Sequence, residues 1–142
     1  MKKIAWKPVL ILLLTAVVIG WAVMQWTGGW SVPASAMKLA NPVPATEATL
    51  AQARLDYEDR CARCHGDSGR GDGPKSKNTW SRPTDFTKTA QMNAMTDGEI
   101  FWKISEGHGS MPAFKTRLAE EQRWALVNYL RTFSKTPSAS AP

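Results

Sequence analysis

Two cysteines and a histidine stand together in the pentapeptide Cys61-Ala62-Arg63-Cys64-His65 of this 142-residue chain. The spacing C-x-x-C-H is the attachment signature of a c-type haem. Two cysteines three positions apart on a turn of helix can each bond one vinyl group of a single porphyrin. The adjacent histidine then lies under the iron and supplies an axial nitrogen. We therefore predict one covalently bound haem c, attached through Cys61 and Cys64 and ligated by His65.

A zinc site and a redox dithiol are the alternative interpretations of this motif. The chain has only two cysteines and two histidines, so a four-ligand structural zinc would need Cys61, Cys64, His65 and His108 together. Cys64 and His65 are adjacent and cannot easily face one tetrahedral centre. A thioredoxin-like dithiol is expected beside a βαβ pattern, and the chain has no run of β-branched strand residues. Both alternatives are therefore disfavoured.

The iron needs a sixth ligand, and Met111 in the segment 107–112 is the predicted one. Glycines in this segment allow the backbone to approach a flat cofactor closely, and Pro112 stiffens the stretch that presents the sulfur. A thioether is a soft, neutral ligand, and His/Met ligation raises the reduction potential of haem iron. The other candidates for this position are Met92, Met95 and His108.

Helical periodicity and capping signals predict three helices after residue 45. The first begins near Thr46, an N-cap residue followed by Glu47, and leads into the haem motif. A capping box at residues 96–99 begins a short helix that continues through Ile104. The last helix runs over residues 119–133. The inward faces carry Leu50, Ala53, Tyr57 and Cys61 on the first helix and Leu126, Val127, Leu130 and Phe133 on the last.

The chain from about residue 46 to residue 133 resembles class I c-type cytochromes. The matching features are the motif at residues 61–66 after a helix, the pair at residues 111–112, and a last helix carrying Trp124 and Tyr129. The resemblance implies an all-α fold around one haem, in which the first and last helices cross. It also implies that Cys61 and Cys64 form thioethers and that His65 and Met111 bind the iron.

Four further residues are expected in the haem environment, one from the resemblance and three from the chemistry of their side chains. In the family a proline carbonyl after the motif accepts a hydrogen bond from the ligand histidine, which fixes the ring. Pro74 is the corresponding residue here. Trp80 and Arg82 have groups that suit a haem propionate, and Trp102 is expected to pack in the core or on the haem. An acidic, glycine-rich stretch at residues 66–73 lacks the ligand spacing of a calcium loop.

The expected domain organisation has five parts. Residues 1–8 are a short basic segment, and residues 9–26 are uncharged, long enough as a helix for about 27 Å of a membrane core of about 30 Å. Residues 27–45 are expected to be a flexible linker rich in Pro, Gly and Ala. Residues 46–134 are the haem domain, and residues 135–142 are a disordered tail.

The N-terminal residues predict export. We expect a retained transmembrane helix that holds the haem domain on the periplasmic side of a bacterial cytoplasmic membrane. The alternative is a signal peptide cleaved after Ala36, because residues 34–36 form an A-x-A-like site. The formal net charge of +6 belongs largely to this region, since 14 Lys and Arg stand against 12 Asp and Glu from residue 46 onward. The domain therefore does not have the charge density of a nucleic-acid-binding protein.

Electron transfer is the function that these features favour. No acid/base pair, nucleophile elbow or P-loop is present, and a haem iron with two protein ligands has no open position for a small-molecule substrate. One interpretation is a tethered carrier between a quinol-oxidising complex and a terminal oxidase or reaction centre. A second is a fixed subunit of a respiratory complex, and a remote third is a haem-based sensor. Basic residues near the motif would steer redox partners: Arg60, Arg63, Lys75 and Lys77.

Overall fold

The chain divides into two units, Met1–Ser31 and Val32–Pro142. The computed structural model describes residues 6–26 and 30–134. In the first unit, helix α1 spans Trp6–Trp26. No helix among the described residues is long and apolar enough to cross a membrane, so the predicted membrane-spanning helix at residues 9–26 is not supported. The predicted tail, residues 135–142, and residues 1–5 of the basic segment lie outside the described residues.

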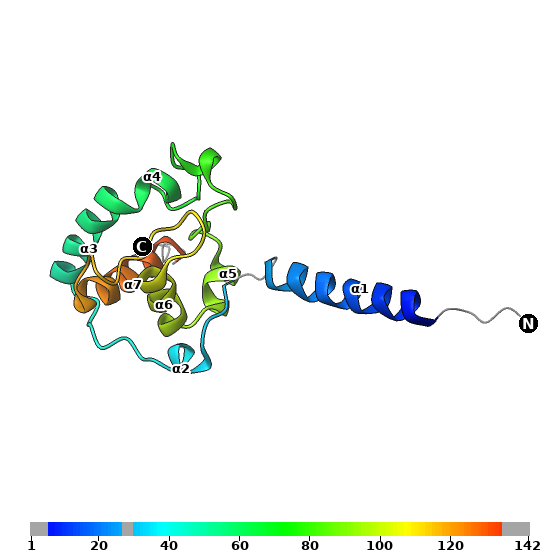
Figure 1. The fold of residues 1–142 in the computed structure, drawn as a ribbon. Coiled ribbons are helices and arrows are strands. Elements are labelled where there is room, and N and C mark those ends of the chain that lie inside the picture. The colour runs from blue at the N-terminus through cyan, green and yellow to red at the C-terminus, as the bar shows by residue number, and fades with distance from the viewer. Residues whose placement is uncertain (1–5, 27–29, 135–142) are drawn as a thin grey trace, which may run out of the picture. The chain divides into compact units, whose positions relative to one another are not determined.

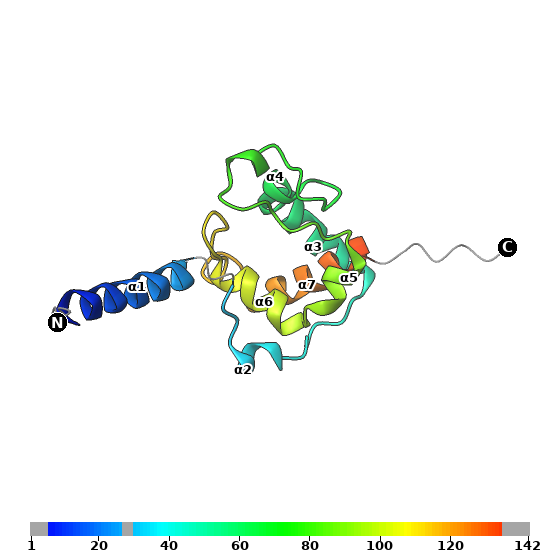
Figure 2. The same ribbon diagram turned by 90° about the vertical axis from the view of Figure 1, so that its right-hand side faces the viewer.

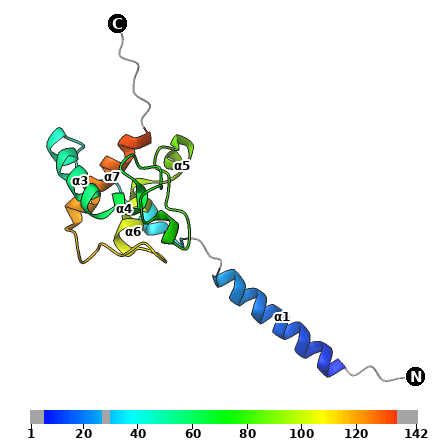
Figure 3. The same cartoon turned by 90° about the horizontal axis from the view of Figure 1, so that it is seen from above.

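The second unit is built on two helices that pack side by side, α3 at Glu47–Arg60 and α7 at Glu120–Ser134 (Figures 1 and 3). Thr46 caps α3 as predicted: its Oγ1 accepts from the Thr49 N–H at 3.2 Å, and Thr49 Oγ1 accepts from the Thr46 N–H at 2.9 Å. This reciprocal pair satisfies two backbone donors that the first turn leaves free.

The hydrophobic core lies where α3, α6 and α7 meet. Tyr57 on α3 and Leu126 and Val127 on α7 are almost completely buried, as the helical periodicity predicted. Phe133, also predicted to face inward, is half-buried at the edge of this core. Phe101 on α6 stacks on the buried Trp124 of α7 with ring centroids 3.9 Å apart, so a pair of aromatic rings joins these two helices.

Two shorter helices connect the haem motif to α7. Helix α5 spans Thr89–Ala94, and α6 spans Asp97–Glu106. Thr96 caps α6 by accepting from the Glu99 N–H at 3.1 Å. The carboxylate of Glu99 does not complete the predicted capping box, because it pairs with Lys103 at 2.6 Å one helical turn later.

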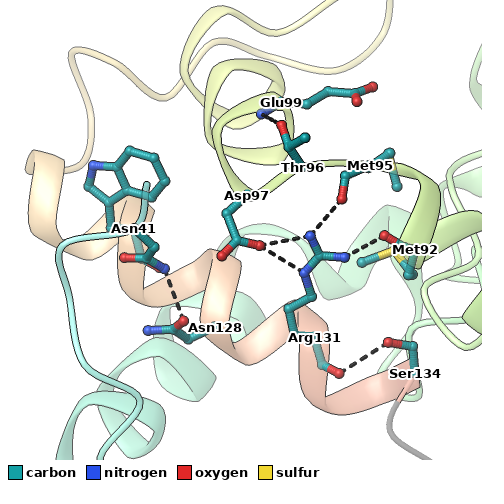
Figure 4. Close-up of polar contacts among 10 residues, drawn as sticks. Asn41, Met92, Met95, Thr96, Asp97, Glu99, Asn128, Arg131 and Ser134 are labelled. Carbon is teal, nitrogen blue, oxygen red and sulfur yellow. Dashed lines mark hydrogen bonds and ion pairs between the residues drawn. The ribbon is translucent and has the colours of Figure 1, made fainter. Parts of the chain in front are cut away.

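Arg131 on α7 holds the junction between α5 and α6. Its guanidinium donates to the carbonyls of Met92 and Met95 and pairs with Asp97 Oδ1 at 2.7 Å (Figure 4). The two carbonyls lie at the end of α5 and just beyond it, where helix carbonyls lack partners within the helix. One side chain of the last helix thereby fixes the position of two earlier helices.

Residues 32–45 differ from the predicted flexible linker. They contain a short helix, α2 at Ala34–Met37, that packs against α6. Asn41 donates from Nδ2 to Asn128 Oδ1 at 2.9 Å (Figure 4). It also donates from Nδ2 to the Trp124 carbonyl at 3.1 Å. The side chain of Val43 packs against the core. Hydrogen bonds with residues more than eighty positions away therefore bind this segment, the N-terminal strap, to the domain.

Candidate haem site

The Cys-x-x-Cys-His residues lie on a single turn of helix. Cys61 ends α3, and α4 spans Ala62–His65. The carbonyl of Cys61 accepts from the N–H groups of Cys64 at 3.0 Å and His65 at 2.9 Å. Because α3 is packed in the core and leads directly into α4, it fixes the position of the backbone that carries both thiols and the imidazole.

Gly66 ends this turn, and Tyr57 anchors it to the core. The Tyr57 hydroxyl, which is fully buried, donates to the Gly66 carbonyl at 2.7 Å. Gly66 has a φ of 78°, and a Cβ there would lie 2.1 Å from Asp72 Oδ1. A side chain at this position would thus be strained and would collide with the loop that follows.

His65 is oriented by two contacts from the returning loop. Its Nδ1 lies 3.2 Å from the carbonyl oxygen of Thr84, and its ring stacks on Phe86 with centroids 4.6 Å apart and 20° between the planes. A carbonyl can only accept a hydrogen bond, so Nδ1 carries the proton and Nε2 keeps its lone pair for a metal. Burial lowers the pKa of His65, which favours the neutral, ligating ring.

The sequence suggested that the Pro74 carbonyl accepts the hydrogen bond from His65, and this assignment was wrong because the Thr84 carbonyl takes that place. The Gly73 N–H donates to the Cys64 carbonyl at 3.2 Å and the Lys75 N–H to the Arg63 carbonyl at 2.8 Å. These bonds hold the backbone around Pro74 against the carbonyls of α4, and the acceptor beside His65 Nδ1 is the Thr84 carbonyl. The Phe86 N–H donates to the Gly69 carbonyl at 2.7 Å and brings Thr84 back beside the imidazole.

Met111 is half-buried and packs against the hydrophobic core. The N–H of His108 donates to the Met111 carbonyl and the N–H of Met111 to the His108 carbonyl, both at 2.9 Å. Gly107 precedes this turn with a φ of 63°, and a Cβ there would lie 2.5 Å from the Met111 oxygen. The glycine is needed because the backbone approaches its own chain closely here.

The rival candidates for the sixth ligand are placed differently. Met92 is fully buried in the core. The sulfur of Met95 lies 3.4 Å from Lys103 Nζ, which donates to it. His108 is exposed at the surface. Burial disfavours Met92 and the contact with Lys103 disfavours Met95, and the choice of sixth ligand stays a prediction.

The two cysteines are free and half-buried. Burial, reinforced by Asp56, raises the pKa of the Cys61 thiol to about 12. A redox-active Cys-x-x-Cys pair has the reverse property, a lowered thiol pKa. In the described residues, no three His, Cys, Asp or Glu side chains gather as metal ligands. The raised thiol pKa therefore disfavours the dithiol interpretation.

The remaining predicted haem neighbours occupy varied positions. Trp102 on α6 is half-buried, whereas Pro74 and Arg82 are exposed. Trp80 has 97% of its surface exposed, and its backbone N–H donates to Ser110 Oγ at 3.1 Å. Sequence reasoning missed Thr84, Phe86 and Ser110. For Phe86 there was a signal, because it is the only aromatic residue between Trp80 and Phe101.

The donor set as a whole fits a c-type haem. The thiols of Cys61 and Cys64 and the imidazole of His65 lie together at α4, and the imidazole keeps Nε2 free. The half-buried thioether of Met111 stands at the end of the hydrogen-bonded turn at residues 108–111. Nitrogen and thioether ligands of this kind are those that hold haem iron in cytochromes.

Residues 48–130 match the family profile of the cytochrome c oxidase, cbb3-type, subunit III. The match covers more than half of the chain, so the chain belongs to this cytochrome c family. Membership implies covalently bound haem c. No curated protein sequence matches the chain.

Two solved structures are similar to the described fold. A chain of the Kuenenia stuttgartiensis reducing HAO-like protein complex Kustc0457/Kustc0458 has 25% identity and a TM-score of 0.58 over 79% of this chain. The KustC0563 c-type cytochrome has 28% identity and a TM-score of 0.53 over 58% of this chain and 98% of its own. This chain spans about half, 54%, of the first of these two. Both agree with a helical c-type cytochrome.

Proposed function

We propose that this protein is a one-electron carrier with a single haem c. The observation that carries the proposal is the α4 turn, which presents Cys61, Cys64 and His65 together with the imidazole Nδ1 held by the Thr84 carbonyl. The only two cysteines of the chain can attach one haem. Membership in a cytochrome c family supports the same conclusion.

Each residue has a defined task in this proposal. Cys61 and Cys64 tether the group covalently, and His65 offers Nε2 while Thr84 keeps its ring from rotating. Met111 supplies the sixth ligand from the turn at residues 108–111. The bound haem contributes a ferric/ferrous couple, and a protein that occupies both axial positions restricts its chemistry to electron transfer.

The test uses the full chain produced in a bacterial host that attaches haem to exported proteins. We expect a mass increase of one haem, a reversible one-electron potentiometric titration, and little carbon monoxide binding by the reduced protein. A Cys61→Ser and Cys64→Ser double variant is the control and should carry no covalent haem. Rapid carbon monoxide binding by the wild type would instead favour the sensor interpretation, and a chain without covalent haem would refute the proposal.

The role within an electron-transport chain has two candidates. The first is a carrier that moves electrons between a quinol-oxidising complex and a terminal oxidase or reaction centre. The second is a fixed subunit of a respiratory complex. The second is supported by the family description, which is that of an oxidase subunit, and by a structural neighbour that belongs to a multi-protein complex.

Native electrophoresis after gentle detergent extraction separates these two candidates. Haem stain that migrates with a small species would support the carrier. Stain that migrates with a large assembly, identified by mass spectrometry, would support the fixed subunit. The companion proteins in that band would also name the reaction that it serves.

We also propose that the haem domain works on the extracytoplasmic side of a bacterial cytoplasmic membrane. The support is the order of a basic segment and an uncharged apolar segment at the start of the chain. Cell fractionation with haem staining tests this location. Staining in the cytoplasmic fraction would contradict it, and alkaline extraction would tell whether the chain stays with the membrane.

A further inference from the structure

Arg123 is a buried cation on α7. Its exposed fraction is 7%, and in the described part of the second unit it is the only buried Lys or Arg side chain. No carboxylate among the described residues forms an ion pair with it. An arginine is almost never buried unless its charge is compensated. Groups other than a carboxylate must therefore balance this guanidinium inside the domain.

The partners of Arg123 lie at the C-terminal end of α6. Its Nη1 donates to the hydroxyl of Ser105, and its guanidinium carbon lies 4.7 Å from the centre of the Phe101 ring. The Ser105 hydroxyl is itself held, because it donates to the Phe101 carbonyl at 2.8 Å. Ser105 is the second-last residue of α6, and the carbonyls at this end of a helix carry partial negative charge. The helix end and the aromatic face therefore compensate the cation together.

The loop that presents Met111, residues 107–115, begins and ends on this same turn of α6. Two N–H groups of the returning chain donate to carbonyls of the turn, both at 3.1 Å: Phe114 to Ile104 and Lys115 to Ser105. The side chain of Phe114 is buried in the core. Figure 2 shows this loop in yellow beside α6, with α7 next to the same helix. The position of the Met111 loop therefore depends on the last turn of α6.

We propose that Arg123 is a positioning residue for the Met111 ligand. The inference rests on the proposed haem site and adds a distant residue that controls it. The guanidinium ties the last turn of α6 to α7, this turn holds both ends of the Met111 loop, and the loop presents the sulfur. A loop already held in its ligating conformation loses little entropy when the sulfur binds iron. Loss of the guanidinium should therefore weaken the sulfur ligation without removing the sulfur.

Imidazole competition in the oxidised, haem-loaded full chain tests the proposal. Imidazole that displaces the sulfur abolishes the weak near-infrared band of methionine-ligated ferric haem. We expect Arg123→Leu to raise the affinity for imidazole by about tenfold, because a buried hydrogen bond of a charged group is lost. Arg123→Lys keeps the charge but lacks the flat guanidinium that stacks on a ring, so its increase should be smaller.

Ser105→Ala is the second variant, and it tests the same contact if Arg123→Leu does not fold. It removes the acceptor of the guanidinium and leaves the backbone bonds of the Met111 loop in place. We expect a rise in imidazole affinity here as well. The double variant should bind imidazole no more tightly than Arg123→Leu alone, because two residues that act through one hydrogen bond are not additive.

Hydrogen–deuterium exchange of residues 107–115 separates positioning from a general loss of stability. Exchange in this segment should be faster in Arg123→Leu and Ser105→Ala than in the wild type. Two controls should change neither this exchange nor the imidazole affinity. Arg117→Leu alters an exposed arginine just after the Met111 loop. Asn41→Ala weakens the N-terminal strap and leaves the last turn of α6 intact.

The outcomes that contradict the inference differ from those that contradict the proposed function. Equal imidazole affinity and equal exchange in the wild type and both variants would overturn the role of Arg123. A similar rise in affinity in Asn41→Ala would also overturn it, because the effect would then follow overall stability. A wild type with covalent haem but no near-infrared band would overturn Met111 as the ligand, and a wild type without covalent haem would overturn the proposed function.

Discussion

The imidazole of His65 depends on a residue that is far from it in sequence. The carbonyl of Thr84 fixes which ring nitrogen carries the proton, and Phe86 covers one face of the ring. Hydrogen bonds of this kind orient a ligand and increase its basicity. The properties of the proposed iron site should therefore respond to changes in the loop at residues 83–87 as well as to changes in the motif.

Met111→Ala should leave the haem attached but remove the sulfur ligand. The weak near-infrared band of methionine-ligated ferric haem should vanish, and the reduction potential should fall because thioether ligation raises it. The absorption spectrum of the oxidised protein and a potentiometric titration measure these two effects. Met95→Leu is the matched control and should keep the band. A band that persists in Met111→Ala would show that another methionine is the ligand.

Tyr57→Phe should lower the free energy of unfolding by about 1 kcal/mol, the net worth of one buried hydrogen bond. The loss is limited because the Gly66 carbonyl also accepts from the Gly69 N–H at 3.0 Å. Denaturant unfolding of the haem-loaded protein near neutral pH measures it. No change in stability would mean that this hydroxyl does not anchor the α4 turn.

The pKa of Tyr57 predicts how stability responds to alkaline pH. Burial raises this pKa above its ordinary value, so the folded chain keeps the phenol proton longer than the unfolded chain does. The unfolded tyrosine ionises at about pH 10, and its contribution to stability is therefore lost as the pH rises above about 10. Unfolding measured between neutral and alkaline pH should show a shallower decline in Tyr57→Phe than in the wild type. Equal slopes would contradict this prediction.

Among the elements, the N-terminal strap has a structural role in the domain that its composition does not suggest. Residues 32–45 contain three prolines and few large apolar residues, yet they lie against α6 and α7. Asn41 and Asn128 act together, since Asn128 Nδ2 also donates to the Val43 carbonyl at 2.8 Å. Gly98 on α6 allows this close approach, because a Cβ there would lie 2.0 Å from the Ala36 oxygen.

Asn41→Ala should release the strap. The substitution removes two donated bonds and the acceptor for the Val43 N–H at 2.9 Å, which together stabilise the fold by about 2 kcal/mol. Trypsin cleavage after Lys38, an exposed residue of the strap, should become faster. Asn93→Ala changes an exposed asparagine on α5 and should leave cleavage unchanged. Equal cleavage rates in Asn41→Ala and wild type would show that these bonds do not hold the strap.

At the scale of the whole molecule, the division into two units predicts which truncations are tolerated. A variant lacking residues 1–31 keeps the strap and all elements of the second unit. It should attach haem and unfold at nearly the same temperature as the full chain. A variant that also lacks residues 32–45 loses the strap's contacts and should be less stable by about 2 kcal/mol or more.

Exported forms of both truncations, compared by haem staining and thermal unfolding, check this prediction. Equal stability of the two would mean that the haem domain begins at residue 46, as the sequence suggested. A marked loss of stability on removing residues 1–31 alone would mean that the second unit does not fold by itself.

The sequence by itself determined the features that depend on neighbouring residues. The spacing of Cys61, Cys64 and His65, the caps at Thr46 and Thr96, and the apolar face of the last helix all act over one or two helical turns. Local spacing sets these features directly, so the helical fold could be predicted and the ends of the three predicted helices agreed to within two residues.

Only the tertiary structure decided the contacts between distant segments. Thr84 reaches His65 across 19 positions, Ser110 reaches Trp80 across 30, and Asn41 reaches Trp124 across 83. Each depends on where a loop returns, which the packing of α3, α6 and α7 determines for the whole chain at once. A polar residue in a loop carries no local signal of its distant partner, and for this reason Pro74 was chosen wrongly and the strap was taken for a linker.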